Sequence, residues 1–318
     1  MDFRELQYIL AIARHQNMTK AAESLYVGQP TLSKFLSSHE QKIGLKLFKK
    51  AGHKYMLTYA GERYVEKAVQ ILRLKDDLDA EIMDIIQKGV GVLKVAFANM
   101  RCTYMLPAVL PAFHRLHPNV NVSLYEGSSS ENDRRLLAGE IDIAFYTFPA
   151  QPDPMIEYIP LSEEELLICT CLNFPLKEQA VKVSDSRWPR LNLDLLRNER
   201  ILLMQPQQRT RQIMDQIFRE KHISFDNVLC TSSIPAILGL VSEGYGVSFI
   251  FDAHLNHFPD RNRIACFSLG DPRAHTSFVA SVRKGGYLPC YARDFIEIVR
   301  NFVTQDPAVH TSCGSAVT

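Results

Sequence analysis

Residues 17–61 read NMTKAAESLYVGQPTLSKFLSSHEQKIGLKLFKKAGHKYMLTYAG, a pattern typical of two short helices, a tight turn and a basic β-hairpin. The apolar positions of the first helix recur at helical spacing: Ala21, Ala22 and Leu25. Gly28 fits the entrance of a second helix without steric penalty, and Pro30 suits its first turn, where a missing N–H costs nothing. We therefore expect the second helix to begin near Gln29.

The second helix offers a polar face that a phosphate backbone would tolerate. That face carries no acidic side chain and consists of Thr31, Ser33, Lys34, Ser37 and Ser38. In a major groove, Gln29 can pair with an adenine edge, Thr31 can meet a thymine methyl group and Lys34 can hold a phosphate. The alternative is the solvated face of an ordinary helical hairpin.

A basic hairpin follows the second helix. After Gly44, residues 47–50 and 55–57 have strand character and flank a turn that contains Gly52. Such a wing could follow the adjacent minor groove. The complete set of expected DNA-binding residues is Gln29, Pro30, Thr31, Ser33, Lys34, Ser37, Lys49, Lys50 and Lys54.

The charge of the chain is divided unevenly. The formal net charge is +1, but residues 1–58 carry nine Lys/Arg against four Asp/Glu, which leaves residues 59–318 mildly acidic. A basic head on an acidic body is expected when only the head meets nucleic acid. The N-terminus is charged at once and no apolar run approaches transmembrane length, so we expect a cytoplasmic protein that does not contact a membrane.

The first 61 residues resemble the winged helix-turn-helix of LysR-type transcriptional regulators. The matching positions are Ala21-Ala22, Leu25, Gln29-Pro30, Leu32-Ser33, Glu40, Gly44, Leu47-Phe48, Lys50, Leu57-Thr58 and Ala60-Gly61. Three residues depart from the family pattern, since Gly28 replaces the usual serine, His39 the usual leucine and Lys50 the usual arginine. The resemblance implies double-stranded operator DNA as a partner, and RNA polymerase is a further candidate.

A long helix is expected over about residues 60–87, within a linker segment of residues 59–89. Its apolar stripe runs at three-and-four spacing through Tyr64, Ala68, Ile71, Leu74, Leu78, Ile82 and Ile85. A single stripe of this length needs a partner, either its own domain or a second subunit. We favour a second subunit, and the resemblance implies the same; we expect a homotetramer built from paired dimers.

From residue 90 to residue 305 the pattern alternates strand and helix, which predicts an α/β body. The resemblance extends over this region and implies a two-lobed, periplasmic-binding-protein-like effector domain. We expect lobe I to contain about residues 90–148 and 263–305 and lobe II about residues 149–262, with crossovers near 147–149 and 252–263. Residues 306–318 are small, polar and aperiodic, which predicts a disordered tail.

Four strand-to-helix junctions face the expected cleft between the lobes, where open α/β sheets bind ligands. They contain hydroxyls, free backbone N–H groups and the guanidinium groups of Arg101, Arg209 and Arg211, which suit a small anion. The expected effector-binding residues are Asn99, Met100, Arg101, Thr103, Ser128, Ser129, Gln205, Thr210, Arg211 and Thr231. The alternative is that the hydroxyls only cap helices and the arginines are solvated.

The seven cysteines could be core thiols, or some of them could form a redox or metal site. Most lie in apolar runs and are expected as core thiols, although Cys169 and Cys171 are two apart on one face of a strand and could form a redox pair or a metal site. No catalytic or metal-ligand spacing is present, so we expect no enzyme, cofactor or metal. We expect a ligand-responsive DNA-binding regulator, activator or repressor; the alternatives are a cysteine-based redox regulator and a clamshell binding protein without regulatory DNA binding.

Overall fold

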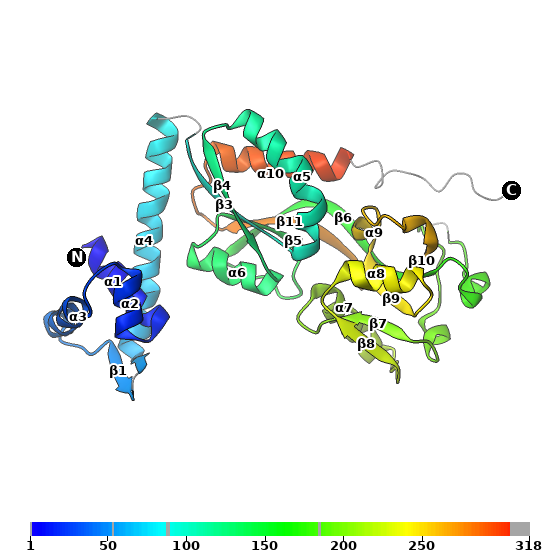
Figure 1. The fold of residues 1–318 in the computed structure, drawn as a ribbon, viewed down its shortest axis with the longest axis horizontal. Helices are drawn as coiled ribbons and strands as arrows, with labels where there is room; N and C mark the ends of the chain where they lie inside the picture. Colours follow the sequence, from blue (N-terminus) through cyan, green and yellow to red (C-terminus); the bar gives the residue numbers. More distant parts are fainter. Residues whose placement is uncertain (1, 53, 87–89, 184–185, 306–318) are drawn as a thin grey trace. The chain divides into compact units, whose positions relative to one another are not determined.

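The computed structural model describes residues 2–52, 54–86, 90–183 and 186–305, and it forms two compact units that divide between Ile86 and Gln87 (Figure 1). The predicted tail at 306–318 and the end of the predicted linker at 87–89 lie outside the described residues. No described helix is both long enough and apolar enough to cross a membrane.

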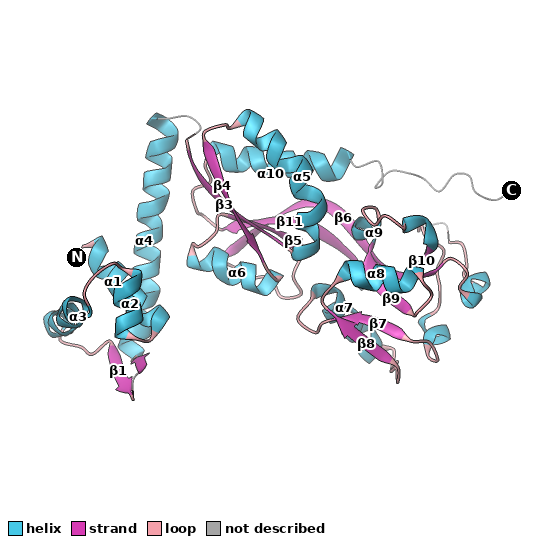
Figure 2. Ribbon diagram, in the orientation of Figure 1, coloured by secondary structure: helices cyan, strands magenta, loops and turns pink. Residues whose placement is uncertain are grey.

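The first unit is a helical domain with a two-stranded hairpin (Figure 2). Its elements are α1 (Phe3–His15), α2 (Met18–Ser24), α3 (Gln29–Ile43), β1 (Phe48–Ala51), β2 (Lys54–Leu57) and α4 (Tyr59–Ile86). Its core is formed by Tyr8, Ile9, Ile12, Met18, Ala21, Ala22, Leu32, Leu36, Leu47 and Phe48. The predicted order of two short helices, turn and basic hairpin is confirmed, and α3 begins at the predicted residue.

Glu40 fixes α3 to the start of the hairpin. Its buried carboxylate accepts hydrogen bonds from the backbone N–H groups of Leu47 (2.9 Å) and Phe48 (3.1 Å), and Lys46 pairs with it at 2.7 Å. Buried carboxylates are stable only when such donors replace water. The angle between α3 and the hairpin is therefore set by hydrogen bonds as well as by apolar packing.

The second unit begins with a sheet that we call lobe I. Its strands are β3 (Gly91–Phe97), β4 (Val120–Glu126), β5 (Ile143–Thr147), β11 (His275–Arg283) and the first half of β6 (Ile156–Cys171). Helices α5 (Asn99–Leu116) and α10 (Cys290–Gln305) pack on one face, and α6 (Ser129–Ala138) covers the other. β3, β4 and β5 are parallel, whereas β11 is antiparallel to both β5 and β6.

The remaining strands of the nine-stranded sheet form lobe II. These are the second half of β6 with β7 (Ile201–Met204), β8 (Val228–Thr231), β9 (Val247–Phe251) and β10 (Ile264–Ser268). Helix α7 (Arg209–Glu220) covers one face, and α8 (Ile234–Ser242) with the short α9 (Asp252–Leu255) covers the other. Four 3-10 turns complete the described chain: Pro175–Gln179, Leu193–Leu196, Arg261–Arg263 and Pro272–Ala274.

The two lobes share β6, which extends from one sheet into the other (Figure 1). Residues 156–165 pair with β11 in lobe I, and residues 166–171 pair with β9 and β10 in lobe II. The predicted crossovers near 147–149 and 252–263 are therefore wrong. The chain crosses within β6 and again between β10 and β11, so residues 156–165 belong to lobe I and β10 belongs to lobe II.

Candidate functional site

The polar face of α3 is open to solvent. Among the residues expected to contact DNA, Gln29, Pro30, Thr31, Lys34 and Ser37 are exposed and Ser33 is half-buried. Gly28 is the N-cap residue and contributes no side-chain cap, so the first N–H groups of α3 receive no side-chain hydrogen bond from that position. The exposed N-terminal turn of α3 thus combines hydrogen-bonding side chains with free backbone donors.

The hairpin carries three exposed lysines beside that helix: Lys49, Lys50 and Lys54. Lys50 lies opposite Tyr55 across the hairpin, and its ammonium group is 5.3 Å from the centre of the Tyr55 ring. Gly52, at φ 61°, makes the turn between the strands. The three cations are therefore presented on a short, twisted ribbon of the kind that can follow a nucleic-acid backbone.

His39 lies on the core side of α3, as its position in the sequence predicts. It is 6% exposed, its Nε2 lies 2.8 Å from the Tyr64 hydroxyl of α4, and its ring stacks on Phe35. Burial lowers the pKa of His39, so the neutral imidazole is favoured. His39, where the LysR-type pattern usually has leucine, makes a hydrogen bond to α4 in place of an apolar contact.

A cleft of about 800 Å³ lies between the two lobes of the second unit. Helix N-termini from both lobes reach it, because Ser128-Ser129, Arg209-Thr210 and Ser232-Ser233 all line it. Of the expected effector-binding residues, six line the cleft: Met100, Arg101, Thr103, Ser128, Ser129 and Thr210. Helix N-termini present free N–H groups and a partial positive charge, which favour an anion.

Three expected residues do not line the cleft: Gln205, Arg211 and Thr231. The Arg211 guanidinium bonds Asp215 at 2.6 Å, the Met204 carbonyl oxygen at 3.2 Å and the Cys230 sulfur at 3.5 Å. It is thus held within lobe II, so its expected place in the cleft is wrong. The side chain of Asn99 lies outside the described part of the chain, but α5 begins at that residue. The sequence pattern predicts a helix over residues 103–116, so the observed helix begins four residues earlier.

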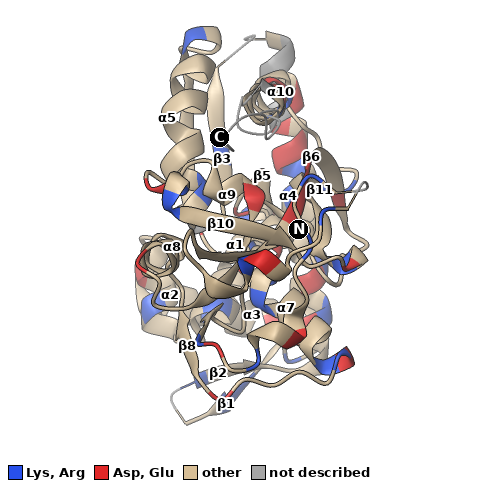
Figure 3. Ribbon diagram, turned by 90° about the vertical axis from the view of Figure 1, so that its right-hand side faces the viewer, with Lys and Arg blue, Asp and Glu red and all other residues tan. Residues whose placement is uncertain are grey.

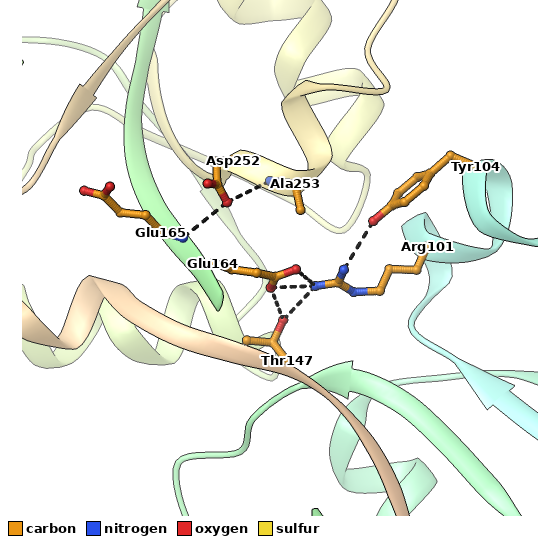
Figure 4. Close-up of polar contacts among 7 residues, drawn as sticks. All are labelled: Arg101, Tyr104, Thr147, Glu164, Glu165, Asp252 and Ala253. Atoms are coloured by element: carbon orange, nitrogen blue, oxygen red, sulfur yellow. Dashed lines mark hydrogen bonds and ion pairs between the residues drawn. The ribbon is translucent and has the colours of Figure 1, made fainter. Parts of the chain in front are cut away.

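Arg101 lines the cleft but has a buried partner (Figure 4). Its Nη2 lies 2.7 Å from both carboxylate oxygens of Glu164 and 3.2 Å from the Thr147 hydroxyl, and Nη1 lies 3.3 Å from the Tyr104 hydroxyl. Both Arg101 and Glu164 are almost completely inaccessible to solvent. The prediction that Arg101 offers a free guanidinium to an anion is therefore wrong, because Glu164 already neutralises it.

Arg209 is the cleft arginine that keeps its charge uncompensated. It is half-buried at the first turn of α7, and its Nε donates a hydrogen bond of 2.9 Å to the Phe148 carbonyl oxygen of lobe I. No carboxylate of the described residues forms an ion pair with it, and burial lowers its pKa. This guanidinium contacts both lobes and can accept an anionic partner.

Acidic groups gather where β6 passes between the lobes. Glu164 and Glu165 of β6 lie beside Asp252, whose carboxylate accepts hydrogen bonds from the N–H groups of Glu165 and Ala253 (Figure 4). Burial and the neighbouring Glu164 raise the pKa of Asp252 to about 6. His254 follows in α9; it lines the cleft, and its buried Nδ1 has no hydrogen-bond partner among the described residues.

The four predicted junctions, at residues 99–103, 127–130, 205–211 and 231–233, also supply Gly127, Gln207, Gln208, Ser232 and Ser233 to the cleft. The cleft residues outside these junctions were not predicted: Ala98, Glu126, Glu131, Tyr146, Thr147, Met204, Ile234, Pro235, Phe251 and His254. Most lie within two residues of a predicted junction, so strand-end position was the available signal. Lys, Arg, Asp and Glu are interspersed over the second unit (Figure 3), and among the described residues no cluster of His, Cys, Asp or Glu could hold a metal ion.

Two family models match the chain. The bacterial regulatory helix-turn-helix protein, lysR family, matches residues 3–62, and the LysR substrate binding domain matches residues 87–303. The second match alone spans more than half of the sequence. A helix-turn-helix at residues 3–62 is not expected in a stand-alone binding protein, so that alternative is not supported.

Known proteins resemble the chain over most of its length. The transcriptional regulator YcgK of Bacillus subtilis is 29% identical over 258 residues, which are 78% of this chain and 79% of YcgK. The structure of a full-length OxyR variant from Pseudomonas aeruginosa has a TM-score of 0.68 at 22% identity and covers 94% of this chain and 95% of that one. The structure of full-length CbnR in complex with its target DNA has a TM-score of 0.55 at 26% identity. The match covers 95% of this chain and 99% of that one.

Proposed function

The chain belongs to the LysR family of bacterial transcriptional regulators, and we propose that it binds operator DNA through α3 and the β1–β2 hairpin under the control of an anionic small molecule in the inter-lobe cleft. The observation that carries the choice of an anion is the guanidinium of Arg209. It lies in the cleft without a carboxylate partner among the described residues.

The exposed face of α3 supports the DNA-binding part of the proposal. Gln29 and Thr31 lie in its first turn, where a recognition helix contacts base edges, and Lys34 is one helical turn further along. The exposed hairpin lysines add sequence-independent contacts to phosphates. In this arrangement α3 reads the sequence, while the hairpin supplies affinity that falls steeply as salt rises.

The surroundings of Arg209 support the effector part. Burial makes its charge costly when unpaired, and an anionic ligand would remove that cost. The N-termini of α6, α7 and α8 add backbone and hydroxyl donors around the cleft, with Ser128 capping α6 and Ser233 capping α8. A carboxylate bound to Arg209 could thus take further hydrogen bonds from both lobes, including those from Thr103 and Ser128 of lobe I.

Control follows from the position of Arg209 between the lobes. Its hydrogen bond to the Phe148 carbonyl joins α7 of lobe II to lobe I, and β6 provides the covalent connection. An anion that binds Arg209 and lobe I together favours the lobe angle in which both contacts are made, and it shifts the equilibrium only by its differential affinity for the two angles. By linkage, operator DNA must change effector affinity by the same factor.

Self-association would use the outer stripe of α4. Among the described side chains of α4, an exposed row in the single chain consists of Leu74, Leu78, Ile82 and Ile86. A continuous apolar row of this length is expected to be covered by a partner. We propose that paired α4 helices form a dimer and that two dimers form a tetramer.

The proposed effector role is tested by thermal unfolding of the full-length protein with small organic acids and inorganic phosphate. An acid that binds the cleft should raise the melting temperature of the wild type and shift its affinity for operator DNA. Arg209→Gln should lose both effects. Arg211→Gln is the matched control, because Arg211 lies on the same helix but is held by Asp215 outside the cleft. An acid that stabilises Arg209→Gln as strongly as the wild type would contradict the proposal.

A further inference from the structure

Two cysteines face each other across neighbouring strands of lobe II. Cys169 of β6 is paired directly with Cys266 of β10 in the antiparallel register. Both side chains point to the same face of the sheet, because both belong to the core cluster beneath α8. The expected partner, Cys171, packs against the cluster on the opposite face, so the prediction that Cys169 and Cys171 share one face is wrong.

The register brings the two cysteines within reach of a disulfide. Directly opposite residues of an antiparallel pair have Cα atoms about 4.5–5.5 Å apart. A disulfide needs a separation of about 4.4–6.8 Å. Both cysteines are free thiols in the structure. Closing the bond therefore requires rotation of two side chains and no movement of either strand to a new register.

The two thiols differ in their access and in their electrostatic surroundings. Cys169 is fully buried, whereas Cys266 keeps 7% of its surface exposed. A hydrogen bond from the Cys169 thiol lowers the pKa of Cys266, and the positive charge of Arg261 lowers it further. Burial raises the pKa of Cys169. Cys266 is thus the more accessible thiol and the one whose surroundings favour the thiolate, so we expect a small reagent to react with Cys266 first.

We propose that Cys169 and Cys266 are a redox-active dithiol, which a hydroperoxide converts into an intramolecular disulfide. The Cys266 thiolate attacks a peroxide oxygen, so an S–O bond forms, the O–O bond breaks and hydroxide leaves, taking a proton to become water. The Cys169 sulfur then attacks Cys266. An S–S bond forms, the S–O bond of the sulfenic acid breaks, and the thiol proton leaves with the hydroxyl group as a second water. Two thiols and one hydrogen peroxide thus give one disulfide and two waters.

The dithiol lies in the same core cluster as part of the cleft wall. Met204 and Ile234 line the cleft and belong to the cluster that contains both cysteines, and Met100 of lobe I packs against it. Oxidation would tie β6 to β10 directly beneath these side chains. The oxidation state of Cys169 and Cys266 therefore affects lobe II independently of which ligand occupies the cleft.

Trp188 provides an optical readout of this chemistry. It is the only tryptophan of the sequence, and it packs against the cluster that contains Cys169 and Cys266. The guanidinium of Arg261 lies 5.6 Å from the centre of its ring. Because disulfides quench indole emission, oxidation of this pair should lower the fluorescence of Trp188, and dithiothreitol should restore it.

The decisive test maps the cysteines of the full-length protein after treatment with hydrogen peroxide. Reduced protein is exposed to graded peroxide, its remaining thiols are alkylated in denaturant, and its peptides are analysed by mass spectrometry. We expect a single cross-linked pair, Cys169 with Cys266, two hydrogen masses lighter than the two free peptides and released by dithiothreitol. The oxidised protein should melt several degrees higher than the reduced protein, since the bond constrains a long loop.

Variants separate this pair from the other cysteines. Cys266→Ser should abolish both the cross-link and the loss of fluorescence, whereas Cys171→Ser, two residues from Cys169 on the same strand, should retain both. If Cys266→Ser does not fold, the map of the wild-type protein decides alone. Recovery of Cys169 and Cys266 as alkylated thiols, a cross-link to any other cysteine, or over-oxidation of Cys266 without a cross-link would each overturn the proposal.

Discussion

Arg101 and Glu164 form a buried ion pair at the point where β6 passes from lobe I to lobe II. Arg101 comes from the first turn of α5, and its guanidinium also lies 3.9 Å from the centre of the Phe278 ring of β11. Side chains from α5, β6 and β11 thus meet at the guanidinium of Arg101. This pair fixes the floor of the cleft, so the charge available to a ligand is that of Arg209.

Removal of one member of this pair should destabilise the second unit strongly. Glu164→Gln leaves the Arg101 guanidinium buried without a counter-ion, which typically costs about 3–5 kcal/mol. The free energy of unfolding in urea measures this loss. The double variant Arg101→Met/Glu164→Leu should recover part of it, because no unpaired charge remains. A loss below about 1 kcal/mol for Glu164→Gln would contradict the assignment of a buried pair.

Stability should depend on pH through Asp252. Its pKa in the folded protein is raised to about 6 from an ordinary value of 3.8, so the native state binds the proton more tightly than the unfolded state does. The charged carboxylate therefore penalises folding above about pH 6, by up to about 2–3 kcal/mol, and the penalty fades as the pH falls towards 4.

Asp252→Asn isolates this effect. The variant should gain stability relative to the wild type at pH 7.5 and lose that relative gain at pH 4.5, because the amide stays neutral at both values. Urea unfolding of both proteins at the two pH values measures the difference. Equal differences at pH 7.5 and pH 4.5 would show that Asp252 does not titrate in this range.

The first unit follows from local sequence patterns. Pro30 and Gly44 mark the start and end of α3, the apolar spacing defines the long helix, and Gly52 marks the hairpin turn. Each of these signals acts within a few residues along the chain. Local patterns were therefore sufficient for element order and for most boundaries.

The errors arise where distant residues decide the structure. The sequence pattern predicts a strand only over residues 165–172, which is the second half of β6. The first half was missed because Pro160 and the run Glu163-Glu164-Glu165 are unfavourable in a strand. In the structure Glu163 bonds Ser277, Glu164 bonds Arg101 and Glu165 approaches His275. The role of Arg101 is likewise set by Glu164, 63 positions away in the sequence. Cys169 meets Cys266 only through strand pairing.

DNA recognition predicts different behaviour for Gln29 and Lys50. Gln29→Ala should cost about 1–3 kcal/mol on a duplex enriched by selection in vitro and little on random DNA, since it removes a base contact. Lys50→Ala should weaken both duplexes alike and reduce the dependence of affinity on salt. Fluorescence anisotropy at two salt concentrations measures both effects. Equal losses on both duplexes for Gln29→Ala would exclude a base-reading role.

The apolar stripe of α4 predicts the oligomeric state of a charged variant. Leu78 is 55% exposed in the single chain, and Leu78→Asp would bury a carboxylate against a partner helix, at a cost of several kcal/mol of association. Sedimentation velocity should show a smaller species. Asp76→Ala, two residues away on the opposite side of the helix, is the control and should leave the oligomer intact. An unchanged oligomer in Leu78→Asp would rule out pairing through this stripe.

Gly61 is required where α4 begins beneath the hairpin. A Cβ atom at this position would lie 2.0 Å from the Leu47 carbonyl oxygen and 3.0 Å from the Leu57 side chain. That carbonyl cannot easily move, because it accepts hydrogen bonds from the N–H and the hydroxyl of Thr58. Any side chain at residue 61 must therefore separate the start of α4 from the hairpin.

Gly61→Ala should consequently destabilise the first unit by about 1–3 kcal/mol and weaken DNA binding, because Leu47 also anchors Glu40 of α3. Gly28→Ala is the matched control for stability, since a Cβ there meets its nearest atoms at 3.6 Å, an ordinary contact. Thermal unfolding of both variants tests the effect on stability, and fluorescence anisotropy of Gly61→Ala tests the effect on DNA binding. If Gly61→Ala melts with the wild type and binds DNA equally well, the contact between α4 and the hairpin is looser than these distances require.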